Sequence, residues 1–431
     1  MNGNGLIVGI NEKPKSIGSW IVLSLQHVFA MFGATVLVPL LTGLDVGVAL
    51  VASGIGTLIY IFFTKAKVPV YLGSSFAYIT TISAAILSAG GPGTAYVGLM
   101  VVGLIYVIIA VIIGFVGSGW LKKLLPPVVI GPMIIIIGLS LAPVAIGSAG
   151  FNGSTSYKEP LVALITFLTV VILSIKAKGF LRIVPFLVAI FVGYVAAMIV
   201  GLVPVDFLFG FIPYPEVFAG YKFFQLPNFS FIGTYAIDFS AVLMFAPLAF
   251  VTIAEHIGDH VVLGEITGND FIQEPGLHKT LLGDGVATFV SAAIGGPANT
   301  TYGENTGVIA ITKVGSVWVT GLAAVFAILL GFFGWIQAFI NSIPWAVIGG
   351  MTIVLYGLIA ANGVKVLIKD KTDLSKMKNL IIVSTMLVIG LGGASLKIFP
   401  TTTLSGMSLA MIAGILLNVV ISLLEKVGPT E

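Results

Sequence analysis

NTTYGENTG, residues 299–307, is the stretch of this sequence that decides the fold. It brings a carboxylate, two side-chain amides, several hydroxyls and two glycines into a region flanked mainly by Val, Ile, Leu and Ala. Irregular polar backbone between long apolar runs is either a short loop outside a membrane or a buried site within it. The remaining sequence favours the second interpretation, in which the stretch forms the floor of a substrate site.

The composition is that of an integral membrane protein. Of the 431 residues, 58% are hydrophobic and only 9% are charged, and the mean hydropathy is +1.13. Soluble domains average about 25% charged residues. Because a spanning helix needs about 20 apolar residues, fourteen spans use roughly 280 residues and leave only short loops. We therefore expect no separate soluble domain.

The apolar runs form two groups of seven, which we interpret as fourteen transmembrane spans in an all-α polytopic protein. The first group occupies residues 18–41, 46–64, 70–89, 95–117, 127–147, 159–176 and 184–203. The second occupies residues 237–262, 279–296, 300–313, 316–341, 344–361, 379–394 and 404–424. A more polar connection, residues 204–236, separates them and is predicted to be extracytoplasmic. The first run is too long for a signal-peptide core, so we predict an uncleaved span.

The basic residues support this count. Cytoplasmic loops carry an excess of Lys and Arg. With the N-terminus in the cytoplasm, all of the 20 Lys and Arg residues except Lys158, Lys222 and Lys397 fall on the cytoplasmic side. Both termini are therefore predicted to be cytoplasmic, in the inner or plasma membrane.

An internal repeat relates the two groups. PPVVIGPM, residues 126–133, and PWAVIGGM, residues 344–351, share Pro, Val, Ile, Gly and Met in register, and they begin spans 5 and 12. Seven is an odd number, so two repeats of seven spans cross the membrane in opposite directions. Inverted repeats of this kind are typical of secondary transporters, whose sites lie near the midplane at the repeat interface.

Spans 3 and 10 are matched by this repeat, and neither is a good continuous helix. Span 3 contains VPVYLGSSF, residues 68–76, and span 10 contains NTTYGENTG. Each pattern predicts a short extended segment followed by a half-helix. The N-termini of the half-helices would direct free N–H groups and positive dipole ends into the middle of the protein.

Three carboxylates are predicted near these breaks. Glu255 and Asp259 are four residues apart, which places them on one face of a helix, and Glu304 belongs to the other break. Carboxylates clustered away from water can hold a proton, so the cluster is a candidate proton-coupling device. In the alternative interpretation span 8 ends earlier, and Asp259 and His260 are wetted at its cytoplasmic end.

Other side chains near the breaks suit a flat, polar ring. Phe76 and Tyr302 can stack on such a ring, whereas Ser75 and Gly303 offer hydrogen bonds; packing is the alternative role for the aromatic residues. His27 lies within span 1, where a hydrogen-bonded strut between helices competes with a role in proton coupling. His256 lies off the face of Glu255 and Asp259, so we expect it to pack.

Several chemistries are excluded or disfavoured. The chain has no cysteine, no phosphate-binding loop and no spaced His and carboxylate metal set, so we expect no cofactor, no metal and no catalytic site. Transport driven by an ion gradient remains, with the proton as the coupling ion. An anion exchanger or channel of similar architecture is the alternative from another class, although the carboxylates argue against anions. An intramembrane enzyme is weakly supported.

The motifs resemble those of the nucleobase–ascorbate transporter family, and in particular its bacterial uracil permeases. ENTG, residues 304–307, followed by Thr312 and Lys313, matches the family signature. QHVFAMFGA (26–34), YLGSSFA (71–77) and AEHIG (254–258) resemble uracil permeases, and the likeness covers nearly the whole chain.

The resemblance implies a fold and a set of roles. It implies a core domain (residues 18–117 and 237–341) and a gate domain (118–203 and 342–425), with short antiparallel strands in spans 3 and 10. Glu255 and Glu304 would hydrogen-bond the pyrimidine, Phe76 would pack on its ring, and the backbone of Gly303 would contact it. Tyr356, on span 12, would approach from the gate side.

One position departs from the uracil permeases. Some of them carry His, tied to proton coupling, where this chain has Asp259, and Asp resembles the residue of purine-transporting relatives. Glu304 favours a pyrimidine, because xanthine and urate carriers commonly have Gln there. We therefore expect a proton-coupled uracil symporter working by alternating access, with a purine or xanthine symporter as the alternative. No nucleic-acid partner is expected, and the commonly dimeric relatives make a homodimer compatible with the resemblance.

Overall fold

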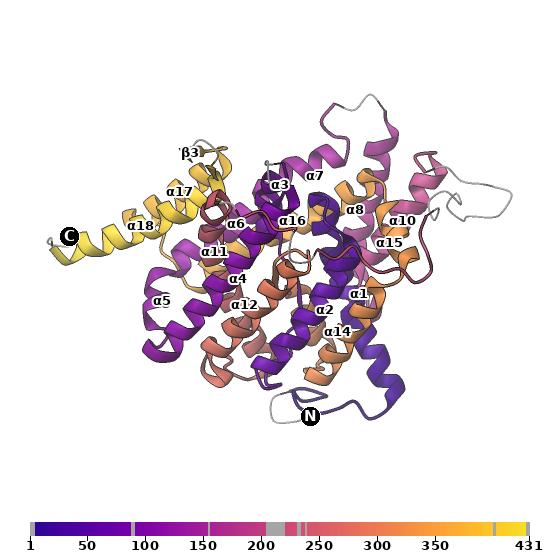
Figure 1. Cartoon of the computed structure of the whole chain (residues 1–431), viewed down its shortest axis with the longest axis horizontal. Helices are drawn as coiled ribbons and strands as arrows, with labels where there is room; N and C mark the ends of the chain where they lie inside the picture. Colours follow the sequence, from indigo (N-terminus) through magenta and orange to yellow (C-terminus); the bar gives the residue numbers. More distant parts are fainter. Residues whose placement is uncertain are drawn as a thin grey trace.

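The computed structural model describes residues 5–87, 91–153, 156–203, 220–230, 234–237, 239–399 and 402–427 (Figure 1). Much of the predicted connection, residues 204–219 and 231–233, lies outside these ranges. Eight helices are long and apolar enough to cross a membrane, and four shorter apolar helices accompany them in the described part of the chain.

The elements follow the predicted order of spans. The first half contains α1 Ile17–Thr42, α2 Val46–Phe63, β1 Leu72–Ser74, η1 Phe76–Tyr78, α3 Ile79–Ile86, α4 Gly91–Val116, α5 Gly119–Leu124, α6 Pro127–Ser140, α7 Ala142–Ser148, α8 Lys158–Lys176, α9 Phe180–Ile183 and α10 Pro185–Ile199. The second half contains α11 Phe239–Thr267, η3 Ile272–Gly276, α12 Leu277–Ala293, β2 Asn299–Thr301, α13 Gly303–Thr312, α14 Val317–Gly331, α15 Gly334–Asn341, α16 Trp345–Lys369, α17 Met377–Leu391, β3 Ser395–Phe399, β4 Thr402–Ser405 and α18 Gly406–Val427. Each predicted span therefore corresponds to a helix, a helix pair or an interrupted segment.

Local sequence sets where the first helices begin and end. The hydroxyl of Ser16 accepts a hydrogen bond from Ser19 N at 3.1 Å and caps the start of α1. Gly43 ends α1 in the left-handed conformation (φ +77°), which glycine adopts without steric cost. Asp45 then caps α2 by accepting from Val48 N at 2.8 Å. These caps fix the tight turn between the first two spans.

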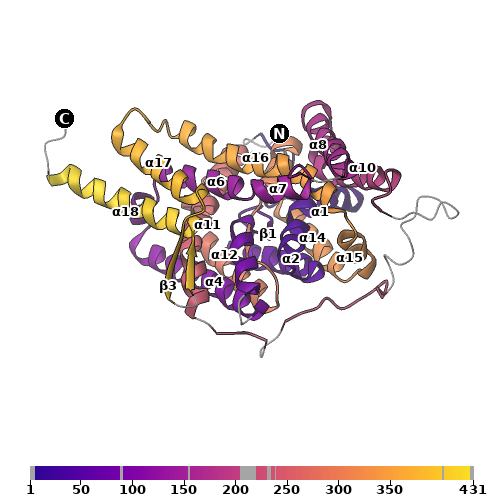
Figure 2. The ribbon, with the colours of Figure 1, turned by 90° about the horizontal axis from the view of Figure 1, so that it is seen from above.

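The packing shows the inverted repeat directly. When each span is exchanged for the span seven places away, the largest contacts between different spans become other observed contacts: α4–α12 becomes α14–α2, α11–α4 becomes α1–α14, α8–α16 becomes α17–α6, and α8–α10 becomes α17–α18. Pairs that map onto themselves, α2–α12, α6–α16 and β1–β2, lie on the axis between the repeats. Figure 2 shows β1 in the middle of the surrounding helices.

The matched motifs behave alike in the two halves. Pro126 and Pro344 are the extended cap residues of α6 and α16, and their carbonyl groups accept from the N–H groups three and four residues on. The two prolines thus begin equivalent helices, as the sequence repeat predicted.

Glycine allows the closest helix approaches. A Cβ atom on Gly331 would lie 2.6 Å from the Gly47 carbonyl oxygen, between α2 and α14. A Cβ atom on Gly103 would lie 2.6 Å from the Gly285 carbonyl oxygen, in the counterpart contact between α4 and α12. Small residues of this kind bring backbones together where lipid provides no hydrophobic drive between helices.

Candidate functional site

Two short strands lie side by side in the interior and form the centre of the site. β1 and β2 pair antiparallel, with Leu72 opposite Thr301 and Ser74 opposite Asn299. Beyond the pair, Ser75 N donates to Ala298 O at 2.9 Å. The strands thus satisfy each other's backbone groups at a depth where water is not available. The predicted breaks in spans 3 and 10 are confirmed.

Polar side chains fasten the strand pair to its scaffold. Thr57 Oγ1 on α2 accepts from Leu72 N at 2.9 Å. Asn299 Nδ2 reaches the carbonyl groups of Ala52 and Ala287, both at 3.3 Å, and so ties β2 to α2 and α12. Asn299 therefore has a structural role within the polar stretch from which the sequence analysis began.

The structure brings the three predicted carboxylates together. Glu255 and Asp259 lie on one face of α11, Glu304 lies in the first turn of α13, and the groups are close enough to interact electrostatically. All three side chains are half-buried. The positive end of the α13 dipole favours negative charge at Glu304.

Asp259 is fixed by a residue that the sequence analysis did not single out. The hydroxyl of Thr301, on β2, donates to Asp259 Oδ2. α11 continues to Thr267, two turns past Asp259, and His260 is completely buried. His260 is therefore not wetted as the alternative for span 8 expected, whereas the place of the half-buried Asp259 in the membrane stays a prediction. Glu255, in contrast, has no side-chain hydrogen bond to any described residue.

An aromatic corner lies beside the strands. The rings of Phe76 and Tyr356 meet edge to face, with centroids 6.3 Å apart and an angle of 76° between planes. Phe76 is half-buried where three apolar clusters meet. The hydroxyls of Ser75 and Tyr356 are buried without a hydrogen-bond partner among the described residues. Buried polar groups are usually paired, so these two hydroxyls are candidates for a hydrogen bond to a ligand.

Two further predicted residues, Gly303 and Tyr302, differ in their surroundings. Gly303 is exposed and has open space where a Cβ would stand. Tyr302 is buried, and its hydroxyl donates to Ser74 O at 3.0 Å and accepts from Thr35 Oγ1 at 3.2 Å. This geometry is that of a packed strut, and a substrate contact by Tyr302 remains a prediction.

His27, on α1, is hydrogen-bonded to Asn305 of the ENTG stretch on α13. Asn305 Nδ2 donates to both His27 Nδ1 and His27 O, each at 3.1 Å. His27 is buried, with 1% of its surface exposed. The arrangement matches the strut between helices that was one of its two predicted roles. It links α1 to the helix that carries Glu304.

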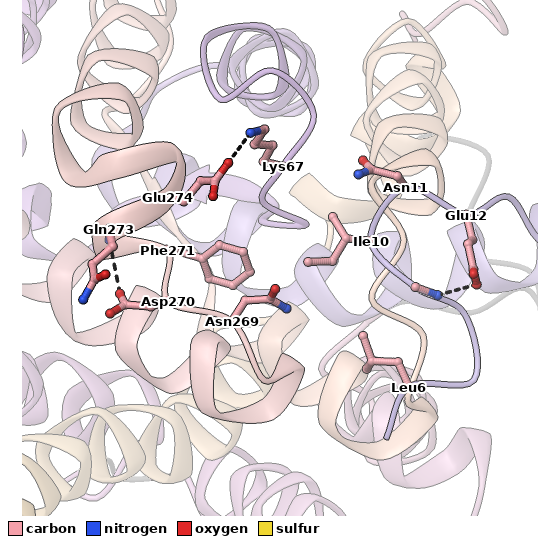
Figure 3. Close-up of a pocket in the computed structure, with 11 residues that line it drawn as sticks. Leu6, Ile10, Asn11, Glu12, Lys67, Asn269, Asp270, Phe271, Gln273 and Glu274 are labelled. Atoms are coloured by element: carbon pink, nitrogen blue, oxygen red, sulfur yellow. Dashed lines mark hydrogen bonds and ion pairs between the residues drawn. The ribbon is translucent and has the colours of Figure 1, made fainter. Parts of the chain in front are cut away.

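A cavity lies away from the strands, beside the N-terminal segment (Figure 3). Its volume is about 690 Å³, and its lining includes Ile10, Phe271 and the Lys67–Glu274 ion pair. None of the described residues that line it belongs to the carboxylate cluster. The candidate site is therefore placed at the strands because the carboxylates lie there, and not because of a cavity volume.

Comparison with known proteins identifies relatives over nearly the whole chain. A model of a permease family matches residues 18–399. The uracil permease of Bacillus caldolyticus is 48% identical over 423 residues, covering 97% of this chain and 95% of that protein. The uracil permeases of Bacillus subtilis (strain 168) and Escherichia coli (strain K12) are 45% and 41% identical, each covering at least 95% of both chains.

Solved structures share the fold at low sequence identity. Murine Slc26a9, an anion transporter in the inward-facing state, superposes with a TM-score of 0.68 at 13% identity, covering 96% of this chain and 69% of that one. The transmembrane domain of the cyanobacterial bicarbonate transporter BicA gives 0.58 at 16% identity, covering 94% and 98%. These similarities concern the fold alone.

Proposed function

The chain belongs to the permease family, and from that premise we propose that it carries uracil across the membrane by proton symport. The observation that carries the proposal is the placement of Glu255, Glu304 and Phe76 on elements that adjoin the β1–β2 strand pair. Uracil is a small flat ring with N–H donors and carbonyl acceptors. Carboxylates accept from ring N–H groups, and an aromatic face covers the ring.

The free groups of the site suit such a ring. Glu255 has no other hydrogen-bond partner among the described residues, and the side chain of Glu304 bonds to no other described residue. The unpartnered hydroxyls of Ser75 and Tyr356 can pair with the ring carbonyls, and the open position at Gly303 admits a ligand next to α13. In this proposal Tyr302 contributes by packing behind the site.

Proton coupling is assigned to the same cluster. Substrate binding places further polar groups beside Glu255, Asp259 and Glu304, and a proton on the cluster reduces the repulsion among their charges. We assign the coupling proton to Asp259 first, because Thr301 holds it beside the strands without placing it at the aromatic corner. His27 would act indirectly, through Asn305.

Alternating access would use the two groups of helices as core and gate. The helices of residues 18–117 and 237–341 pack mainly on one another, as do those of residues 118–203 and 342–425. The groups meet through smaller contacts, α1–α10, α11–α18 and α11–α6. Sliding of one group against the other would expose the strands to each side in turn.

The orientation follows from charge. Lys67 pairs with Glu274, Lys369 with Glu265 and Lys378 with Glu425. Each ion pair joins segments that the span count assigns to one side of the membrane. We propose that this side, which also carries both termini, is cytoplasmic, and that the protein resides in the plasma membrane as a monomer or a homodimer.

Uptake of labelled uracil by cells lacking their own uracil carrier tests the proposal. Uptake that collapses with a protonophore supports both the substrate and the coupling. Uptake of labelled xanthine that is competed by xanthine but not by uracil would instead identify a purine-type symporter, the alternative that Asp259 favours. Chloride or bicarbonate currents without saturable nucleobase uptake would overturn the proposal.

A further inference from the structure

A second polar cluster is buried on α11, outside the candidate site. It consists of His256 and His260 on α11, Asp284 on α12 and Tyr60 on α2, and none of the four side chains is exposed. His256 Nδ1–H donates to Asp284 Oδ2 at 2.8 Å. Buried charge is retained only where it is paired, so this contact needs an explanation.

A second hydrogen bond joins His260 to Tyr60. His260 Nδ1–H donates to the backbone carbonyl of His256 at 2.6 Å, which leaves Nε2 as the acceptor of a neutral ring. Tyr60 therefore donates its hydroxyl proton to His260 Nε2, at 2.5 Å. The two imidazoles stack with centroids 4.0 Å apart, so the links support each other.

The histidines of this cluster and the carboxylates of the candidate site lie on the same helix, α11. Glu255 and Asp259 occupy one stripe of α11, and His256 and His260 occupy the next, one residue on in each case. Successive residues are about 100° apart around a helix, so the two stripes keep a fixed angle. Any rotation of α11 that displaces the histidines displaces both carboxylates.

The packing around α11 shows which helices the two hydrogen bonds connect. α2 and α12 belong to a scaffold closed by the glycine contacts with α14 and α4. α11 packs mainly on α4, with smaller contacts to α18 and β4, and it has little direct contact with α12. The His260–Tyr60 and His256–Asp284 hydrogen bonds add direct polar links from α11 to α2 and to α12, beside the indirect connection through α4.

We propose that the His256–Asp284 and His260–Tyr60 hydrogen bonds are positioning contacts that set the rotation of α11. They hold Glu255 and Asp259 toward Glu304 without touching the substrate. The consequence for transport rests on the proposed function, whereas the consequence for the rotation of α11 does not.

The expected effect is large enough to measure. Side chains lie about 5–6 Å from a helix axis, so a rotation of about 20° moves a carboxylate by about 2 Å. A displacement of about 1 Å can cost a site about 100-fold. We therefore expect loss of the His256 link to weaken uracil binding by about 10- to 100-fold.

The binding test compares His256→Leu with the conservative His256→Gln, which retains a donor for Asp284. Purified variants are assayed for the Kd of labelled uracil and for Tm. A matched control, Gly47→Ala, disturbs the α2–α14 contact away from α11 and loses stability by another route. The proposal expects weakened binding in His256→Leu, recovery in His256→Gln and little change in the control. Equal weakening in His256→Leu and the control at equal loss of Tm would overturn it.

A second readout does not depend on uracil. The chain has no cysteine, and Gly258 on α11 has open space around its Cβ position. A single cysteine there can be modified by a water-soluble thiol reagent, with and without His256→Leu. The proposal expects the modification rate to change several-fold. An unchanged rate would overturn it, even if the wild-type protein binds no uracil and the proposed function has failed.

Discussion

Replacement of Glu304 by Gln is the most informative change at the candidate site. Gln has nearly the same shape but no charge, and it offers an N–H donor where the carboxylate only accepts. The Glu304 side chain bonds to no other described residue, so the exchange leaves the strand pair and the start of α13 intact. Loss of binding without loss of folding is therefore expected.

The magnitude follows from the hydrogen bond that is lost. A hydrogen bond to a charged group contributes about 1.5–3 kcal/mol, and about 1.4 kcal/mol corresponds to a tenfold change in Kd. Glu304→Gln should therefore raise the Kd for uracil by about 10- to 100-fold and abolish uptake at low substrate concentration.

The assay is binding of labelled uracil to purified protein, with thermal unfolding as the control for folding. Glu255→Ala, in which the second carboxylate is removed, should behave alike because that side chain also lacks a protein partner among the described residues. A Kd within threefold of wild type in Glu304→Gln, with full uptake, would refute the assignment of this residue.

Three further changes probe other parts of the account. Asp259→Asn should leave uracil uptake insensitive to a protonophore; unchanged gradient dependence would show that Asp259 is not the proton carrier. Gly285→Leu would place a Cβ 2.8 Å from the Gly103 carbonyl oxygen and should destabilise the protein by about 1–3 kcal/mol, read as a lower Tm in detergent. Lys67 lowers the pKa of the Glu274 carboxyl through a hydrogen bond and its charge, so their pair stabilises the fold at neutral pH, and the stabilisation is lost as the pH falls through the lowered pKa. Because both groups are exposed, Lys67→Met should leave uptake at pH 7 unchanged, and a large loss there would show that the nearby cavity takes part in transport.

Much of the fold was predictable because the bilayer imposes strong constraints on sequence. The spans follow from apolar length, and the breaks at spans 3 and 10 follow from glycine and polar residues where helices should continue. The sidedness expected from Lys and Arg stays a prediction. The shared Pro and Gly positions of residues 126–133 and 344–351 revealed the repeat. Each of these signals is local or periodic along the chain.

The contacts that the sequence analysis missed depend on tertiary structure. Thr301 is one of three hydroxyl residues close together, and only the antiparallel register shows that it faces Asp259. His256 was expected to pack because it lies off the face of Glu255 and Asp259. Its partner Asp284 lies 28 residues away on another helix, so no local pattern reveals the contact. The β3–β4 hairpin was also missed, since two short strands between long apolar runs produce no strong periodic signal.

The most direct test of the central claim is accumulation of labelled uracil by the purified protein in sealed liposomes with an imposed pH gradient. The account predicts accumulation above equilibrium when the outside is acidic, collapse of that accumulation when the gradient is dissipated, and none in Glu304→Gln. Uracil that only equilibrates, at a rate independent of the gradient, would contradict proton symport through the carboxylate cluster.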